Sequence, residues 1–225
     1  MEVNLINYTK NGIETIANAV RTTGPFFNQM DDRKLVRYMV EHDYGSTLEH
    51  VYFTFELKDI SIALTRELLE HRIASHTARS TRYVSQADEM PVYIPPDIKG
   101  SLRENVMKHM EKTHELYKQI EKEVSRESAR YVLPLALKCT YIWTINCRSL
   151  LNFLRLRLCK NAAPEIRLMA TKIKEEVTKI YPEIFETVGC RGSQWGICPE
   201  PKNRSCGKYP TKKDIMQLYN KKSNV

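Results

Sequence analysis

The residues best suited to chemistry in this sequence cluster between positions 71 and 83, in the stretch HRIASHTARSTRY. It contains imidazole, guanidinium and hydroxyl groups but no acid. Guanidiniums offer a planar fork of N–H donors and hydroxyls add short donors, so such a cluster is typical of a phosphate-binding site. A solvated basic loop is the alternative, because charged runs are usually exposed. The small residues Ala74 and Ala78 favour a site, because they allow a ligand to approach closely.

A second candidate group lies on the helix predicted for residues 147–160. Arg148, Asn152 and Arg155 are spaced so that they share one helix face, whereas Arg157 falls on the opposite, apolar side. An unpaired cation among apolar residues is costly, which favours a functional or paired role for Arg157. A snorkelling side chain or a structural ion pair is the alternative. One helix would then serve two polar sites, as expected where active sites form between subunits.

The periodicity of apolar residues predicts the elements that position these groups. Strands are predicted at 2–8, 51–57 and 139–145, and helices at 13–20, 31–44, 60–71, 100–125, 128–137, 147–160, 164–181 and 211–220. Asp59 is the expected N-cap of the helix that precedes the basic stretch, and Pro134 is expected to kink or end its helix. Residues 71–83 and 84–97 are expected to be loops. The long charged helix at 100–125 has only a thin apolar stripe, which is typical of an outer helix or of an arm that contacts another subunit.

Size and composition indicate an ordinary globular protein. The 225 residues are 42% hydrophobic and 28% charged, which fits one domain at 1–189 followed by a Cys- and Lys-rich tail at 190–225. No apolar run approaches the ~20 residues of a membrane span and no signal peptide is evident, so we expect a cytoplasmic protein without a membrane partner. The net charge of +8 indicates anionic partners, either nucleic acid or phosphorylated small molecules.

The six cysteines fall into two groups. Three lie in predicted core elements, where we expect reduced thiols, and three are spaced eight apart in the tail: Cys139, Cys147 and Cys159, then Cys190, Cys198 and Cys206. The tail has no Cys-x-x-Cys pair and only three local thiols. Free thiols or a disulfide that staples the tail are therefore favoured over a metal site, and we assign no metal ligand.

Four segments of the sequence together resemble the flavin-dependent thymidylate synthase (ThyX) family. The basic stretch resembles the signature Arg-His-Arg-x-x-Ser with a later Ser-x-Arg, which here runs from Glu70 to Arg82. Residues 45–50 resemble a Ser/Thr-Pro-x-Glu-His segment, and residues 129–134 an Ala-Arg-x-Val-Leu-Pro segment. Residues 146–153 resemble Asn-Ala-Arg-Ser-Leu-x-Asn-Phe, with an arginine beyond. All four follow the family's order and spacing.

The resemblance implies an α+β fold, a mixed sheet with flanking helices in a single ThyX-like domain. It implies a homotetramer that holds FAD and dUMP at subunit junctions and methylates dUMP at C5 to give dTMP, using methylenetetrahydrofolate and NADPH. Matching positions imply that FAD is held by Ser46, His71, Arg72, Asn146, Arg148 and Asn152, and the nucleotide by Ser80, Arg82, Arg130 and Arg157. Hydride addition to uracil places negative charge on the ring, which Arg157 would stabilise as the catalytic cation. Ser80 is interpreted as a phosphate ligand rather than a nucleophile.

Two acids depart from the family pattern and are counted among the substrate-binding candidates. Glu70 replaces the first Arg of the signature, and Glu67 replaces a usual Gln. A carboxylate near a nucleotide phosphate is repelled by about 1–4 kcal/mol at 4 Å, depending on the dielectric constant. These departures favour an alternative, a diverged flavoprotein of the same fold that acts on another pyrimidine nucleotide or lacks methylation activity. A nucleic-acid-binding protein is a third, less favoured interpretation, because no recognised motif accompanies the charge.

Overall fold

The computed structural model describes residues 1–222, with side chains described as far as residue 219. In this range the chain forms two compact units, residues 1–6 with 54–144 and residues 7–53 with 145 onward. The first unit contains the basic stretch, and the second contains the helix that carries Arg148 and Arg157. The sequence-based division into residues 1–189 and a tail stays a prediction.

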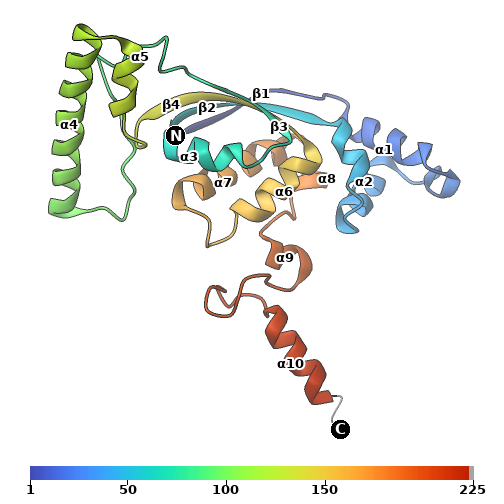
Figure 1. Ribbon diagram of the computed structural model, residues 1–225. Helices are drawn as coiled ribbons and strands as arrows, with labels where there is room; N and C mark the ends of the chain where they lie inside the picture. Colours follow the sequence, from blue (N-terminus) through green and yellow to red (C-terminus); the bar gives the residue numbers. More distant parts are fainter. Residues whose placement is uncertain (223–225) are drawn as a thin grey trace. The chain divides into compact units, whose positions relative to one another are not determined.

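A four-stranded sheet has the strand order β1-β2-β4-β3 (Figure 1). Its strands are β1 (Glu2–Tyr8), β2 (Tyr52–Ser61), β3 (Ala74–Ala78) and β4 (Lys138–Asn146). The hydroxyls of Thr54 on β2 and Thr144 on β4 are 3.0 Å apart, and the Cys147 N–H, just after β4, donates to the Val51 carbonyl, just before β2. Paired residue numbers therefore rise along β2 while they fall along β4. The same holds for the contacts between β1 and β2 and between β3 and β4, so the described strands form an antiparallel sheet rather than the mixed sheet expected. The α+β class is confirmed.

The alternating pattern predicted for 51–57 is confirmed. Its apolar members Val51, Phe53, Phe55 and Leu57 are all fully buried. In the first unit, the ring of Phe55 lies 6.1 Å from that of Trp143 on β4. Large apolar side chains on one face of adjacent antiparallel strands thus form the core beneath the sheet.

The start of the helix before the basic stretch differs from the prediction. β2 continues through Asp59, which has a left-handed φ of 57°, and ends at Ser61. The Ser61 hydroxyl accepts the Leu64 N–H at 3.0 Å, so Ser61 rather than Asp59 caps α3 (Ile62–Leu69). Aspartate tolerates the left-handed region, which lets the strand bend before the helix begins. On α3, Leu64 and Leu68 are buried, whereas Ala63 is exposed.

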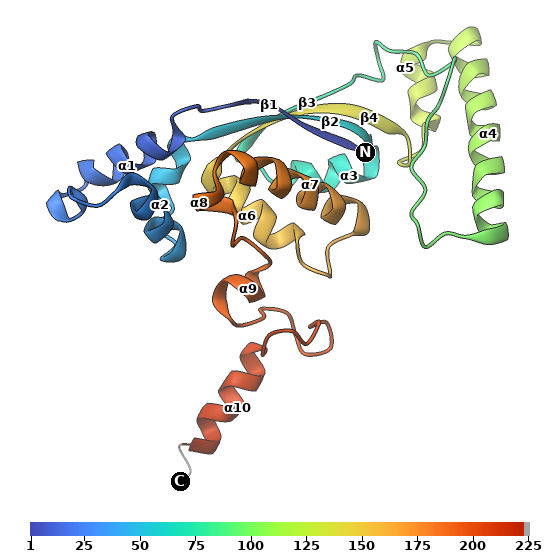
Figure 2. The same ribbon diagram turned by 180° about the vertical axis from the view of Figure 1, so that it is seen from behind.

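The remaining helices of the first unit are α4 (Gly100–Glu123), α5 (Arg126–Ala129) and the short 3-10 turn η3 (Arg130–Val132). α4 confirms the predicted long outer helix, and it contacts α5 and η3 (Figures 1 and 2). The helix predicted at 128–137 is shorter, because Pro134 cannot continue it. Tyr117 is the buried member of α4, whereas Leu116 on α4 and Val124 just after it are exposed.

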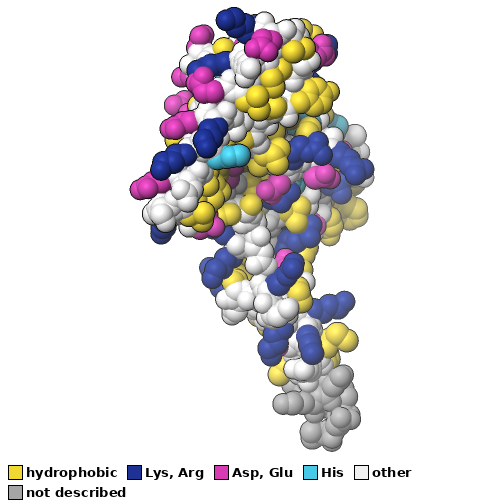
Figure 3. Space-filling model, turned by 60° about the vertical axis from the view of Figure 1, so that its left-hand side comes forward, with side chains coloured by type: hydrophobic (Ala, Val, Ile, Leu, Met, Phe, Trp, Pro, Cys, Tyr) yellow, Lys and Arg dark blue, Asp and Glu magenta, His cyan; other side chains and the backbone are white. Residues whose placement is uncertain are grey.

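The helices of the second unit agree largely with the predictions. They are α1 (Gly12–Thr22), η1 (Pro25–Phe27), α2 (Asp32–Glu41), η2 (Ser46–His50), α6 (Cys147–Arg157), α7 (Pro164–Ile180), α8 (Pro182–Phe185), α9 (Arg191–Trp195) and α10 (Lys212–Lys222). Asp31 caps α2 by accepting the Lys34 N–H. Pro164 occupies the first turn of α7, where its missing N–H has no cost. Figure 3 shows many Lys and Arg side chains over the tail. Within residues 1–222, no helix combines the length and apolarity needed to cross a membrane.

Candidate active site

The basic stretch is partly a strand rather than the loop expected. β3 pairs with β4, and the Arg79 N–H continues that pairing by donating to the Thr140 carbonyl at 2.9 Å. His76 is fixed from both sides, since its Nδ1 lies 3.1 Å from the Tyr141 hydroxyl and its Nε2 lies 3.2 Å from the His71 carbonyl. Burial, with a smaller contribution from a nearby cysteine, raises the pKa of Tyr141, so its hydroxyl stays protonated. These contacts therefore fix the backbone of β3, from which the segment that carries the following arginines continues.

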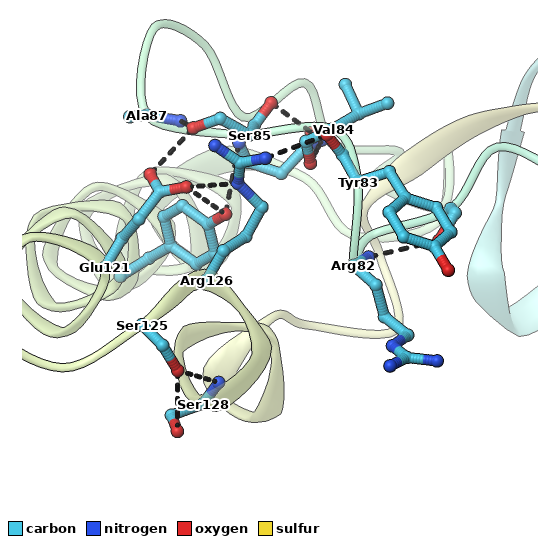
Figure 4. A network of polar contacts seen from close by, with 12 residues as sticks. Arg82, Tyr83, Val84, Ser85, Ala87, Glu121, Ser125, Arg126 and Ser128 are labelled. Atoms are coloured by element: carbon cyan, nitrogen blue, oxygen red, sulfur yellow. Dashed lines mark hydrogen bonds and ion pairs between the residues drawn. The ribbon is translucent and has the colours of Figure 1, made fainter.

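A clamp formed by Arg126 and Glu121 holds the segment after β3 (Figure 4). Arg126 Nε bonds Glu121 at 2.6 Å, and its Nη1 donates to the Tyr83 carbonyl at 2.8 Å. The Ser85 hydroxyl donates to the second oxygen of Glu121 at 2.7 Å. The hydrogen bond from Arg126, with smaller contributions from Ser85 and Tyr117, lowers the pKa of Glu121. The clamp binds the Tyr83 carbonyl and the Ser85 side chain together, so it fixes the chain just after Arg82.

Three predicted nucleotide ligands lie at this segment or on the adjacent η3 turn. The Arg82 N–H donates to the Ser80 hydroxyl at 3.2 Å, and the Arg82 guanidinium forms an ion pair with Glu127 at 3.1 Å. Arg130, three residues after Glu127, is half-buried and stacks over the ring of Tyr131 at 5.5 Å. In Figure 4 the Arg82 side chain points away from the Arg126 clamp. Glu127 was not identified from the sequence, although it lies just before the recognised segment 129–134.

The two unexpected acids lie at the end of α3. Glu67 is half-buried on the last turn, and Glu70 is exposed at the C-cap position. The following residues, His71 and Arg72, are half-buried and exposed, respectively. An acid at the C-terminus of a helix faces the negative end of the helix dipole, which is unfavourable. The stability of the helix therefore does not account for Glu70.

In the second unit the structure joins two segments that are 99 residues apart in the sequence. Arg148, in the first turn of α6, forms an ion pair with Glu49 at 2.6 Å. Its side chain also lies on Gly45, where an added Cβ would be 2.8 Å from Nε and 3.2 Å from Cγ. Ser46 follows, exposed, and Thr47 keeps a buried hydroxyl without a hydrogen-bond partner among the described residues. Gly45 and Glu49 were not identified as functional, although both lie inside the recognised segment 45–50.

Three other predicted site residues, Asn146, Asn152 and Arg157, lie at the start of α6 or on it, and their surroundings differ. The Asn146 oxygen accepts the Ser149 N–H at 2.8 Å and so caps the helix. Asn152 is exposed, and Arg157 is half-buried as the last residue of the helix.

The fully buried cation of α6 is Arg155 rather than Arg157. Arg155 is 8% exposed and forms an ion pair with Asp43 at 2.7 Å, so it does not share the exposure of Arg148 and Asn152. The prediction considered the helix alone. In the structure α9 contacts α6, and tail residues help to cover Arg155 in a pocket.

Known proteins resemble most of this chain. Residues 4–183 match the family model described as thymidylate synthase complementing protein. The flavin-dependent thymidylate synthase of Pyrococcus furiosus is 38% identical, with an alignment that covers 89% of this chain and 90% of that protein. The enzyme of the same name from Clostridium tetani is 32% identical, with 96% of each chain covered.

A solved structure agrees with these sequence relatives. The flavin-dependent thymidylate synthase ThyX of Helicobacter pylori, complexed with FAD and dUMP, superimposes with a TM-score of 0.70 and 28% identity. The match covers 84% of this chain and 100% of that one. With the family model, the relatives and the fold in agreement, this chain belongs to the flavin-dependent thymidylate synthase family.

Proposed function

We propose that the protein is a flavin-dependent thymidylate synthase that methylates dUMP at C5 to give dTMP. Methylenetetrahydrofolate is the proposed carbon donor and NADPH the proposed reductant. The observation that carries the proposal is the joining of Gly45, Glu49 and Arg148. This contact brings together two of the four segments by which the chain resembles a family whose H. pylori member was solved with FAD and dUMP.

The residues of the second unit fit an anionic dinucleotide such as FAD. Arg148 is more than half exposed, yet Glu49 and the bare backbone of Gly45 fix its position. The orphaned Thr47 hydroxyl lies in the same segment. The proposed FAD ligands are Ser46, Asn146, Arg148 and Asn152 in this unit, with His71 and Arg72 in the first unit. Bound FAD supplies the hydride chemistry that amino-acid side chains lack.

Ser80, Arg82 and Arg130 are proposed to bind the dUMP phosphate in the first unit. The ion pair of Arg82 with Glu127 joins two side chains that are 49% and 62% exposed, so it contributes little stability. A phosphate group with two negative charges can therefore replace Glu127 as the partner of Arg82. The Ser80 hydroxyl accepts the Arg82 N–H, which suits a ligand better than a nucleophile.

Arg157 is the proposed catalytic cation. It is half-buried at the end of α6, where its field is less screened by water than that of an exposed arginine. Its task is to stabilise the negative charge that develops on the uracil ring, without proton transfer. Glu67 and Glu70 are proposed to contact the substrate through ribose hydroxyl or amine donors rather than through phosphate.

A diverged activity is the second candidate, because Glu70 lies at the C-cap of α3 without benefit to that helix. A carboxylate accepts hydrogen bonds from an exocyclic amine or from a 2′-hydroxyl. Comparing dUMP with UMP and dCMP as substrates therefore distinguishes the two activities.

We also propose a homotetramer with active sites between subunits. Leu102 and Leu116 of α4 and Val124 just after it are 58%, 46% and 71% exposed, which suits an arm that packs on another copy. Light scattering after size-exclusion chromatography tests this proposal, and a monomer in the presence of FAD would contradict it. The cytoplasmic location stays a prediction.

The decisive experiment is an anaerobic spectrum of the purified protein. We expect bound flavin, which is reduced by NADPH and reoxidised when dUMP and methylenetetrahydrofolate are added together, with dTMP as the product. Reduced flavin that is not reoxidised when dUMP is added, but is reoxidised with another nucleotide, would support the diverged activity. A protein that binds no FAD would contradict both.

A further inference from the structure

Four of the six cysteines line one small pocket in the second unit. Cys159 follows the end of α6, Cys190 caps α9, and Cys198 and Cys206 lie in the loops before α10. All four are free thiols in the structure. The pocket has a volume of about 60 Å³, far below the roughly 300–1,000 Å³ of small-molecule and cofactor sites. It is therefore too small for a nucleotide or a flavin and suits a single ion with its immediate ligands.

The same pocket contains unsatisfied positive charge. Arg155 lines it and is 8% exposed, yet only its Nη1 is engaged, by Asp43. Its Nε and Nη2 are buried and have no hydrogen-bond partner within residues 1–222. Leaving buried donors unpaired is costly. The other charged lining residues are Lys160, Arg191, Arg204 and Glu200. The site is thus built for a species that carries net negative charge.

We propose that these four cysteines bind one thiophilic divalent metal ion, Zn²⁺ foremost, as a tetrahedral thiolate site. Each thiol loses its proton to solvent on binding, and no electron is transferred. Four thiolates around a divalent ion carry a net charge of −2, which the surrounding cations balance. The free N–H groups of Arg155 can then donate to the sulfurs, as outer partners of metal ligands commonly do. Inorganic phosphate would satisfy Arg155 but would leave the presence of four thiols around one pocket unexplained.

Binding requires the thiols to move closer together. In the described part of the chain, no three His, Cys, Asp or Glu side chains are already arranged as a ligand set. Zn–S bonds are about 2.3 Å long. Cys159 is anchored at the end of α6, whereas Cys198 and Cys206 belong to loops that can close on the ion. Three of the four thiols lie beyond residue 183, where the family match ends, so the ion would fasten the tail onto the conserved fold.

The test uses the full chain, purified under reducing conditions without chelators. We expect about one zinc per chain by elemental analysis, and one Co²⁺ per chain after exchange, with the absorption bands of tetrahedral cobalt thiolate. Cys159→Ser and Cys198→Ser should each weaken Co²⁺ binding at least tenfold. Cys139→Ser is the matched control, because Cys139 lies on β4 outside the pocket. Circular dichroism checks that each variant folds.

Several outcomes would overturn the proposal. One is a reduced wild-type protein that neither contains zinc nor binds Co²⁺, a result that does not depend on any variant. Others are a disulfide between tail cysteines in freshly purified protein, or iron with acid-labile sulfide in place of a single ion. Metal content is measured without FAD or dUMP. A protein without bound metal would therefore contradict the metal site but not the proposed enzyme activity. A protein without enzyme activity would contradict that activity but not the metal site.

Discussion

The two units position the arginines that we propose as ligand-binding residues in different ways. In the first unit, Arg126 binds Glu121 and a backbone carbonyl and so fixes the loop, which leaves Arg82 exposed on that loop for a ligand. In the second unit, Arg148 both packs on Gly45 and carries the exposed charge. Positioning and binding are thus separate in the first unit and combined in the second. In the first unit we therefore expect that one mutation changes folding stability and another changes ligand affinity. In the second unit we expect that displacing Arg148 also weakens ligand binding.

The largest effect is expected at Arg157, which is proposed to stabilise the transition state as well as to bind the nucleotide. Arg157→Ala should lower kcat by about 10²- to 10³-fold, because a charge that stabilises the transition state is removed. FAD content and the KM for dUMP should change much less. Single-turnover flavin reoxidation measures the step directly, with Arg167→Ala, on the half-buried surface of α7, as a control. Wild-type turnover by Arg157→Ala would contradict the role of Arg157 as the catalytic cation.

Arg82 and Arg126 test the separation of roles in the first unit. Arg82→Ala should raise the Kd for dUMP about 10- to 100-fold, as expected when a charge-assisted hydrogen bond to phosphate is lost. The thermal midpoint should stay nearly constant, because the exposed pair with Glu127 contributes little.

Arg126→Ala should have the opposite effects, a lower thermal midpoint and a smaller direct change in phosphate affinity. Calorimetry of dUMP binding and thermal melts of both variants decide the point. Equal effects of the two substitutions on both quantities would show that the roles are not separate.

Gly45→Ala should weaken FAD binding about tenfold, an effect of about 1.4 kcal/mol. The new Cβ would lie 2.8 Å from Arg148 Nε and must displace that side chain. The φ of Gly45 is −84°, which alanine adopts easily, so the backbone should tolerate the change. Fluorescence titration of FAD measures the effect, and Gly24→Ala is the control, since its nearest contact is an ordinary 3.7 Å. Unchanged FAD affinity would mean that the position of Arg148 is unimportant.

The smallest effect is expected from the pH dependence of the Glu121 clamp. Folding lowers the pKa of this carboxyl from its ordinary 4.5, so its stabilisation is present above pH 4.5 and is lost as the pH falls through the folded value. The thermal midpoint of wild type should therefore exceed that of Glu121→Gln at pH 6, and the gap should narrow below pH 4.5. Glu111→Gln, at an exposed position of α4, should show no such narrowing. A difference in thermal midpoint that stays constant with pH would contradict stabilisation by the ionised Glu121 carboxylate.

The sequence predicted best those elements whose signals are local. Apolar alternation over 51–57 predicted which side chains are buried, and Pro164 predicted the start of α7. The four recognised segments predicted the family, because they are read directly from residue order. Asp59 shows the limit of such signals. It is a good capping residue by type, but the strand continues through it and the cap passes to Ser61.

The residues of the candidate site stay a prediction from the sequence, and the contacts between them could not be predicted from it. The ion pairs of Arg82 with Glu127 and of Arg148 with Glu49 join distant segments, so no periodicity reveals them. β3 was missed because its residues lack an apolar alternation, and pairing with β4 decides its conformation.

By itself the sequence determined the family, the α+β class and most helices, and it predicted which residues would bind phosphate and flavin. The tertiary structure alone decided which arginines hold loops and which remain available. It also decided that Arg155, rather than Arg157, is buried, and that Cys159 joins the three tail thiols in one pocket. The physical reason is that helix periodicity and residue type are local properties. Burial and charge pairing, in contrast, depend on which distant segment packs against a given side chain.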